Sequence, residues 1–274
     1  MPTSLGNPAD ITRRAVEVLG AVPVIACEDT RTTRRLLNTL GIAAPRLVSY
    51  TDHNKAGRTP QLVGQLADGD VALVSEAGMP GISDPGQELV AAAIVAGYRV
   101  VPLPGPSAAL AALAGSGLPT RRFLFLGFLP RTGGGRRKAL REVASLDCTL
   151  VVYESPRRVR ATLGDVLAVL GERRVVAARE ISKTYEEFIR GTASEILARL
   201  DEPLGEFTLV IEGAGQKEGG EDLEVAGAKL AARLAAEGRS GKDIVEQLIS
   251  ELGLPRRQAY ALANSARAAA AGGS

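Results

Sequence analysis

The stretch VALVSEAGMPGISDPG, residues 71–86, decides the fold that the sequence predicts. Its first four residues are apolar and typical of a short buried strand, and a loop rich in glycine and proline follows. Glycines let a ligand approach the backbone closely, while prolines restrict the unbound loop, so less entropy is lost on binding. The loop is longer than the ordinary connection of about 2–6 residues. We therefore favour a ligand site at this strand end over an ordinary strand-to-helix loop.

Strand-like and helix-like stretches alternate on both sides of this loop. The other strand-like stretches are residues 22–29, 46–50, 99–105, 123–128, 149–155, 174–180 and 207–213. The helix-like stretches are residues 8–19, 31–40, 59–67, 156–170 and 193–200. This alternation predicts an α/β fold with mainly parallel strands and with helices on the faces of the sheet.

A pause in the pattern at residues 115–122 divides it into two halves. We predict two α/β domains, at residues 1–118 and 119–213, then a polar linker at 214–222 and a helical extension at 223–274. The extension is rich in alanine and contains two helices that break at Gly253–Pro255. A helix-turn-helix that contacts RNA and a hairpin that packs on the rest of the protein fit this pattern equally well.

The composition excludes several classes of protein. Lys and Arg number 33 and Asp and Glu 31, so the formal charge of +2 argues neither for nor against a nucleic-acid partner. One histidine, His53, and two separated cysteines, Cys27 and Cys148, leave no basis for a His/Cys metal site or a disulfide framework. No apolar run approaches the ~20 residues of a membrane helix and no secretory signal opens the chain, so we expect a cytoplasmic location.

Three further loops are candidates for chemistry. In residues 2–10, Gly6 gives access to the backbone, although the same segment also suits a helix entry. Glu28 and Asp29 end a strand just before Arg31, an arrangement that suits either helix capping or a site that holds a hydroxyl and a phosphate. Residues 102–110 place small side chains near a helix start. No P-loop, dinucleotide-binding or Gly-x-Ser-x-Gly motif is present.

Basic residues gather in the second half. Residues 131–141 hold five basic residues and no acid on a glycine-rich stem, and Glu154 precedes three arginines at positions 157, 158 and 160. A run of charge is usually a solvated face. Here the glycines and the lack of acids favour a flap that contacts phosphates.

Nine motifs occur in the order found in one family: PTSLGNPADIT, CEDTRTTRRLL, YTDHN, EAGMPGISDPG, VPLPGPSAAL, GLP…RFLFLGFLPR, GRR…L, VVYESPRRV and ARE(I)SKTYEE. Together, from Pro2 to about Gly213, they resemble the small-subunit ribosomal RNA methyltransferase I family, in the tetrapyrrole methylase class of S-adenosylmethionine-dependent methyltransferases. The resemblance implies two α/β domains with the cofactor between them, and a homodimer. It also implies methyl transfer to the ribose 2′-hydroxyl of a cytidine in the decoding region of 16S rRNA in the small ribosomal subunit. The resemblance does not imply that the protein binds DNA, a membrane or a metal.

The resemblance also implies which residues bind and react. S-adenosylmethionine is expected on the following residues: Thr3, Leu5, Gly6, Ser75, Glu76, Ala77, Gly78, Pro80, Ile82, Ser83, Asp84, Gly105, Ser107, Ala108 and Glu154. The candidates for the base that accepts the hydroxyl proton are Glu28, Asp29, Glu76 and His53. We favour Glu28 and Asp29, with Arg31 on an RNA phosphate. RNA is expected to bind to the following basic residues: Arg131, Arg136, Arg137, Lys138, Arg157 and Arg158, with Arg160, Arg256 and Arg257 as further contacts.

Two departures and two alternatives accompany this interpretation. The family usually begins with a strand of the type Leu-Tyr-x-Val, whereas here Met1 directly precedes PTSLGN, so we expect either a first sheet that lacks a buried strand or a start upstream. Met79 stands where the family often has Thr. The alternative functions are methylation of a tetrapyrrole, such as a cobalamin or sirohaem precursor, and a non-catalytic role in ribosome assembly.

Overall fold

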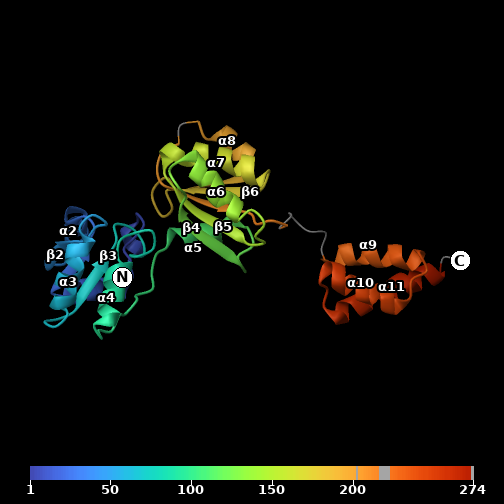
Figure 1. Cartoon of the computed structure of the whole chain (residues 1–274), viewed down its shortest axis with the longest axis horizontal. Coiled ribbons are helices and arrows are strands. Elements are labelled where there is room, and N and C mark those ends of the chain that lie inside the picture. Colours follow the sequence, from blue (N-terminus) through green and yellow to red (C-terminus); the bar gives the residue numbers. More distant parts are fainter. Residues whose placement is uncertain (202, 216–222, 273–274) are drawn as a thin grey trace. The chain divides into compact units, whose positions relative to one another are not determined.

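The computed structural model describes residues 1–201, 203–215 and 223–272. The chain forms two compact units, Met1–Ala214 and Gly215–Ser274 (Figure 1), and each is described by itself. The first unit contains two sheets with their helices, and the second is entirely helical where it is described. The predicted α/β class with a helical C-terminal extension is therefore confirmed. The predicted boundary at 118/119 stays a prediction, and residues 216–222 of the predicted linker lie outside the described residues.

The first sheet has three parallel strands in the order β2-β1-β3. These strands are β1 (Val24–Cys27), β2 (Arg46–Ser49) and β3 (Val71–Val74). All four residues of β1 are buried, as expected of a central strand with helices on both faces. Ile25 and Cys27 belong to one apolar cluster and Val24 and Ala26 to another, because successive side chains point to opposite faces.

The helices of this half partly match the predicted stretches. Their bounds are η1 (Pro8–Asp10, a 3-10 helix), α1 (Arg13–Ala21), α2 (Thr30–Thr39), α3 (Lys55–Gln65), α4 (Gln87–Val95) and α5 (Ala108–Ser116). The single helix predicted at 8–19 is wrong. Thr12 adopts an extended conformation and its side chain accepts a hydrogen bond from the backbone of Ala15, so α1 begins after Thr12.

The strand predicted at residues 99–105 is also wrong. This segment pairs with no strand among the described residues, and β3 forms one edge of the sheet. Pro102 and Pro104 lack the N–H groups that a ladder needs. Val100 and Val101 remain 39% and 42% exposed, whereas Leu103 is buried. Strand-like composition here therefore does not produce a strand.

The second sheet has five strands in the order β4-β5-β8-β6-β7. They are β4 (Phe123–Phe128), β5 (Thr149–Glu154), β6 (Arg174–Arg179), β7 (Glu187–Thr192) and β8 (Phe207–Ile211). The helices are α6 (Gly133–Glu142), α7 (Pro156–Leu170) and α8 (Ala193–Arg199). Only the β4–β5 pair is parallel and the other three pairs are antiparallel, so the predicted mainly parallel arrangement is wrong for this sheet. The sequence prediction missed β7, an edge strand with no fully buried residue that contains Gly191.

The second unit is a group of three helices with its own apolar core. The helices are α9 (Leu223–Ala236), α10 (Gly241–Leu252) and α11 (Arg256–Gly272). Leu234, Ile244, Leu248 and Ala263 are among its buried residues. The predicted break is confirmed, because Gly253 adopts a left-handed conformation that ends α10. In the described part of the chain, no helix combines the length and apolar character needed to cross a membrane.

Candidate active site

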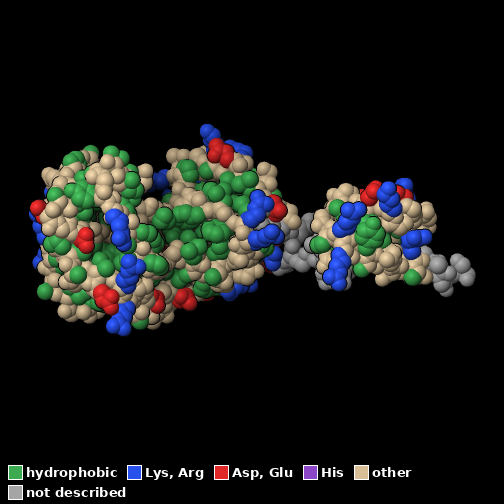
Figure 2. All heavy atoms as spheres, turned by 90° about the horizontal axis from the view of Figure 1, so that it is seen from below, with side chains coloured by type: hydrophobic (Ala, Val, Ile, Leu, Met, Phe, Trp, Pro, Cys, Tyr) green, Lys and Arg blue, Asp and Glu red, His purple; other side chains and the backbone are tan. Residues whose placement is uncertain are grey.

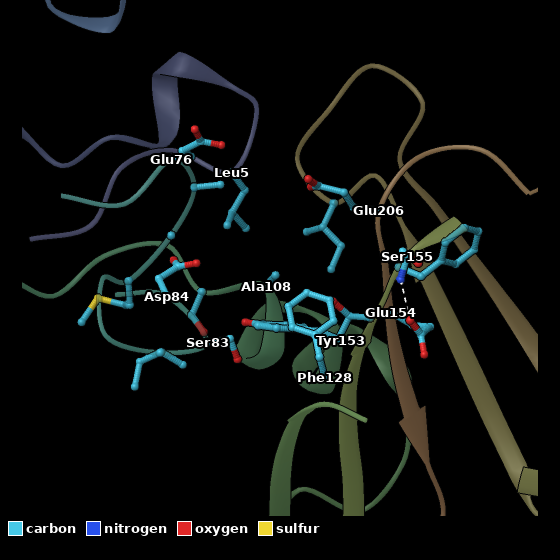
Figure 3. A pocket seen from close by; sticks show the side chains of 18 of the residues that line it. Leu5, Glu76, Ser83, Asp84, Ala108, Phe128, Tyr153, Glu154, Ser155 and Glu206 are labelled. Carbon is cyan, nitrogen blue, oxygen red and sulfur yellow. Dashed lines mark hydrogen bonds between the residues drawn. The ribbon is translucent and has the colours of Figure 1, made fainter. Parts of the chain in front are cut away.

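A cavity of about 420 Å³ lies in the first unit, between the loops that follow the first sheet and the ends of the second sheet (Figure 3). Its lining residues are Leu5, Glu28, Glu76, Ala77, Gly78, Met79, Ile82, Ser83, Asp84, Ser107, Ala108, Phe128, Tyr153, Glu154, Ser155, Pro156, Ala178, Ile181, Glu206, Phe207 and Thr208. The volume falls in the range of about 300–1,000 Å³ that is typical of small-molecule sites. The loop singled out at residues 75–86 thus forms one wall of a real cavity.

Ten of the fifteen predicted cofactor residues line this cavity. They are Leu5, Glu76, Ala77, Gly78, Ile82, Ser83, Asp84, Ser107, Ala108 and Glu154. Thr3, Gly6, Ser75, Pro80 and Gly105 are not among the lining residues. Their contribution to cofactor binding stays a prediction, and the contacts of Thr3 and Ser75 show how the loop is held.

Thr3 and Ser75 fix the loop that forms this wall. The backbone of Thr3 exchanges hydrogen bonds with Gly78, at 3.0 and 3.3 Å between N and O atoms. The Thr3 hydroxyl donates to the Ser75 carbonyl and the Ser75 hydroxyl to the Gly78 carbonyl, at 3.1 and 2.8 Å. Gly78 needs to be glycine because its φ is +75°, in the left-handed region. Two segments about 70 residues apart therefore hold each other in place before any ligand binds.

Five acidic residues line the cavity: Glu28 after β1, Glu76 and Asp84 from the loop after β3, and Glu154 and Glu206 from the half that holds the second sheet. Burial, then the charges of Glu28 and Glu76, raise the pKa of Asp84 to about 6. Burial, then the charges of Glu76 and Asp52, also raise the pKa of Glu28. No three His, Cys, Asp or Glu side chains of the described residues are placed to hold a metal ion. The wall is therefore acidic. Its carboxylates can attract a cation, and one of them can accept a proton.

The predicted pairing of Asp29 with Glu28 in catalysis finds no support in the geometry. The Asp29 side chain accepts hydrogen bonds from the backbone of Arg31 and Thr32, at 2.7 and 3.4 Å, and so caps α2. The Arg31 guanidinium is bound to the same carboxylate at 3.0 Å. Neither residue lines the cavity, and nor does the exposed His53. Of the four candidates for the base, Glu28 and Glu76 line the cavity, whereas Asp29 and His53 do not.

Glu154 reaches the cavity wall, but its carboxylate is already bound within the protein. It accepts hydrogen bonds from the backbone of Ser155 at 2.8 Å and from the Thr162 hydroxyl at 2.6 Å. The Arg158 guanidinium lies 3.3 Å away, and the Glu154 side chain has no exposed surface. The carboxylate therefore orders the start of α7, and a direct role in closing the site is disfavoured.

Three of the predicted RNA-binding residues are bound to acceptors within the protein, and of these Arg136 is buried, Arg158 is partly exposed and Arg137 is exposed. Arg136 is only 7% exposed and lies 2.6 Å from the Asp165 carboxylate, so its prediction as an RNA contact is wrong for this conformation. Arg137 joins the same carboxylate at 3.1 Å, and Arg158 donates to the Leu129 carbonyl at 2.7 Å. Arg131, Lys138 and Arg157 are exposed. They stay predicted RNA contacts.

The basic side chains on the surface do not form one continuous patch on the face shown in Figure 2. Figure 2 shows Lys and Arg side chains in separate groups on the face in view, with hydrophobic and neutral side chains between them. The near balance of 33 basic and 31 acidic residues likewise gives no single large positive field. An RNA partner would therefore be held by a few local contacts.

The sequence analysis missed the aromatic residues that line the site, among them Phe128 and Tyr153. Both lie at or near the ends of strands that point into the cavity, β4 and β5. The Tyr153 hydroxyl accepts a hydrogen bond from the Ala109 backbone at 3.2 Å, and burial raises the pKa of Tyr153. The signal that could have found them was present: Phe128 is the last residue of β4 and Tyr153 the last but one of β5, so both lie next to the loop after their strand.

Comparison with known families decides the class of the protein. The model of the Tetrapyrrole (Corrin/Porphyrin) Methylases matches residues 2–197. The chain belongs to this methylase family. Within the first unit, the matched residues cover both sheets except β8, and the lining of the cavity except Glu206, Phe207 and Thr208.

Named relatives of this methylase are similar over nearly its whole length. A protein of Micromonospora olivasterospora named ribosomal RNA small subunit methyltransferase I is 47% identical over 264 residues, or 95% of this chain and 84% of the relative. A protein of the same name from Halalkalibacterium halodurans is 46% identical over 94% of this chain and 91% of the relative. The chain therefore also belongs to the family of these ribosomal RNA methyltransferases.

Solved structures show the same fold at lower identity. Uroporphyrin-III C-methyl transferase from Thermus thermophilus, complexed with S-adenyl homocysteine, has a TM-score of 0.55 and is 21% identical. The match covers 77% of this chain and 94% of that chain. The predicted fold type is thereby confirmed.

Proposed function

We propose that this methylase transfers a methyl group from S-adenosylmethionine to the ribose 2′-hydroxyl of a cytidine in the decoding region of 16S rRNA, in the small ribosomal subunit. The observation that carries the proposal is the identity of 46–47%, over 94–95% of the chain, to proteins named for methylation of small-subunit ribosomal RNA. The uroporphyrin enzyme is only 21% identical, which favours RNA over a tetrapyrrole as substrate. A homodimer and a cytoplasmic location belong to the same proposal.

The cavity fits the cofactor in size and in charge. Its 420 Å³ suits a molecule of this class, and the carboxylates of Glu28, Glu76 and Asp84 attract a positive charge. When bound, S-adenosylmethionine supplies a methyl group on a positively charged sulfur. The stiff loop and the small Ala77, Gly78 and Ala108 leave backbone accessible on that wall. A related enzyme of the same fold was solved with S-adenyl homocysteine, which supports the assignment.

The residues of this chain would mainly align the reacting groups and remove a proton. A ribose hydroxyl is a poor nucleophile at neutral pH, and a positioned base contributes roughly 10²–10⁴ in rate. We assign this role to Glu28, because it faces the cavity and its pKa is raised towards the pH of the reaction. Asp84 and Glu76 lie on the same wall and keep it negative.

The test is methylation of small ribosomal subunits that lack the modification, with labelled S-adenosylmethionine and mapping of the modified ribose. The wild-type protein is expected to modify one cytidine. Glu28→Gln is expected to lower the single-turnover rate roughly 10²–10⁴-fold and to leave cofactor affinity close to wild type. A full rate in that variant would end the assignment of Glu28. Cofactor binding without transfer to any subunit precursor would instead favour the assembly role.

RNA binding is a separate part of the proposal. Exposed Arg131, Lys138 and Arg157 are the predicted contacts on which this part of the proposal rests. Charge reversal at Arg131 and Lys138 is expected to weaken RNA binding and to flatten its dependence on salt. The matched control is reversal of Arg13, which is exposed on α1 in a surface pair with Glu17. Equal affinities of the two variants would remove these residues from the RNA-binding surface.

A further inference from the structure

We propose that Phe128 is a stacking platform for the base of the nucleotide whose ribose is methylated. This inference rests on the proposed function, and it adds a residue that specifies a single-stranded nucleotide as substrate. The starting observation is that Phe128 is 55% exposed and lines the cavity. An exposed aromatic ring at a cavity is where a ligand with a flat apolar face gains most from contact.

A bulge in β4 aims this ring. Phe125 and Phe128 are three residues apart, so in a regular strand their side chains would point to opposite faces of the sheet. The register against β5 shifts between Phe125 and Gly127. Both rings consequently contact Tyr153, with centroids 4.9 Å away for Phe125 and 5.6 Å for Phe128. Bulges of this kind re-aim side chains next to active sites.

Gly127 makes the bulge possible. Its φ is +60°, a conformation that L side chains rarely adopt. A Cβ at this position would also lie 3.1 Å from the Ser83 hydroxyl oxygen, which belongs to the opposite wall. Ser83 itself has a positive φ of 64°, so both walls are held in unusual backbone conformations where they meet. The close approach of Gly127 to Ser83 brings the end of β4, which carries Phe128, next to the loop that carries Ser83 and Asp84, and Figure 3 shows these three residues around the same cavity.

The platform is braced before any substrate arrives. Tyr153 supports the Phe128 ring at an interplanar angle of 58°, and its own hydroxyl is held by the Ala109 backbone at 3.2 Å. Leu129, the residue after Phe128, is also held, because its carbonyl accepts a hydrogen bond from Arg158 at 2.7 Å. The position of the ring is therefore set by neighbours that the cofactor does not supply.

The surroundings favour an RNA base as the occupant. Exposed Arg131 follows Phe128 by three residues, so an aromatic surface and a cation lie close together in one segment. This combination is how proteins hold single-stranded nucleic acid, with bases on rings and phosphates on cations. A base that is turned out of its stack onto a ring also presents its ribose to the reacting groups.

The test compares Phe128→Ala, Phe128→Leu and Phe128→Tyr with Phe123→Ala. Phe123 is a matched control because it lies on the same strand, is 42% exposed and does not line the cavity. The affinities to measure are those for a labelled 16S rRNA fragment of the decoding region and, separately, for S-adenosylhomocysteine. The KM for small subunits and kcat are measured in parallel.

Phe128→Ala and Phe128→Leu are expected to weaken RNA binding and raise the KM for the subunit roughly 5- to 150-fold, because the stacking surface is lost. Leucine keeps most of the apolar volume of phenylalanine but has no aromatic ring. A loss of RNA affinity that Phe128→Leu shares with Phe128→Ala would therefore show that stacking on the ring is what binds the base. Phe128→Tyr and Phe123→Ala are expected to bind RNA like wild type. Affinity for S-adenosylhomocysteine is expected to stay unchanged in all four variants.

Two results would overturn the inference. If Phe128→Ala bound RNA as tightly as Phe123→Ala, the ring would not be a platform. If it lost affinity for S-adenosylhomocysteine and kept its affinity for RNA, the ring would hold the cofactor instead. Failure of the wild-type protein to methylate any ribosomal RNA would contradict the proposed function. The RNA-affinity comparison would still decide the role of Phe128.

Discussion

Asp84 is the cavity residue whose ionisation should cost stability. Its pKa of about 6 in the folded protein lies above the value of about 3.9 for an unfolded chain. The folded state therefore holds the proton more tightly, and ionisation above pH 6 favours unfolding. This cost is fully present above pH 6 and disappears as the pH falls towards 4.

Asp84→Asn should consequently stabilise the protein in a pH-dependent way. We expect the melting temperature to rise above that of wild type at pH 7–8 and the difference to shrink as the pH approaches 4. Thermal unfolding across this range measures it. Asp68→Asn, at an exposed position after α3, is the control that should show no such trend. A constant difference at all pH values would mean that the Asp84 carboxylate is not the source.

Arg136 has a structural role that its position in a basic segment concealed. It is buried against Asp165, which also binds Arg137. Arg136→Ala leaves a buried carboxylate with one exposed partner, so we expect the free energy of unfolding to fall by about 3–5 kcal/mol. Denaturant unfolding measures this, with Arg131→Ala as an exposed control. An equal effect of the two substitutions would show that the ion pair contributes little.

At the scale of elements, α2 illustrates how a capping residue can resemble a catalytic one. The Asp29 carboxylate accepts from the backbone of Arg31 and Thr32. Asp29→Ala should remove this cap and lower the melting temperature by about 2–4 °C, whereas Asp29→Asn keeps an equally good cap. Because Asp29 does not line the cavity, single-turnover methyl transfer should stay close to wild type in both variants. A large loss of rate in Asp29→Asn would restore the catalytic assignment.

Many helices and strands were predictable, but β7 was missed, and residues 133–141 of the predicted flap belong to α6. The strand at 123–128 and the helix at 156–170 occur with the predicted bounds. Pro156 at the first helical position and Gly171, with φ of +78°, mark the two ends of α7 by local chemistry. Residues 99–105 have strand-like composition as well, but a strand needs a partner, and none of the described residues provides one. Composition cannot report the presence of a neighbour.

For the whole molecule, the two units have separate cores, with Met1–Ala214 containing the whole cavity. A protein that ends at Ala214 is expected to fold and to bind S-adenosylmethionine as tightly as the full chain. Titration calorimetry on both proteins measures this. Loss of binding in the shorter protein would show that the C-terminal helices support the site.

The function of the C-terminal unit can be tested in the full chain. Arg256 and Arg257 are exposed at the start of α11, away from the buried core of the three helices. If they contact RNA phosphates, reversing both charges should weaken RNA binding and reduce the salt slope by about 1.4. Arg233, in the last turn of α9, pairs with Glu237 just after that helix and is the control. Unchanged affinity would favour a helical unit that packs on protein.

The sequence by itself determined the α/β class, most strands and helices, the break at Gly253 and the stiff loop at residues 75–86. These features depend on residues that are close together in the chain, such as caps, prolines and apolar runs. Only the tertiary structure decided that Glu28 faces the cavity while Asp29 caps a helix, that Arg136 is buried, and that Phe128 lines the site. The Asp29 cap itself is local, but the other features depend on partners far away in the chain, such as Asp165 for Arg136 or Tyr153 for Phe128, and no local pattern records which segments meet.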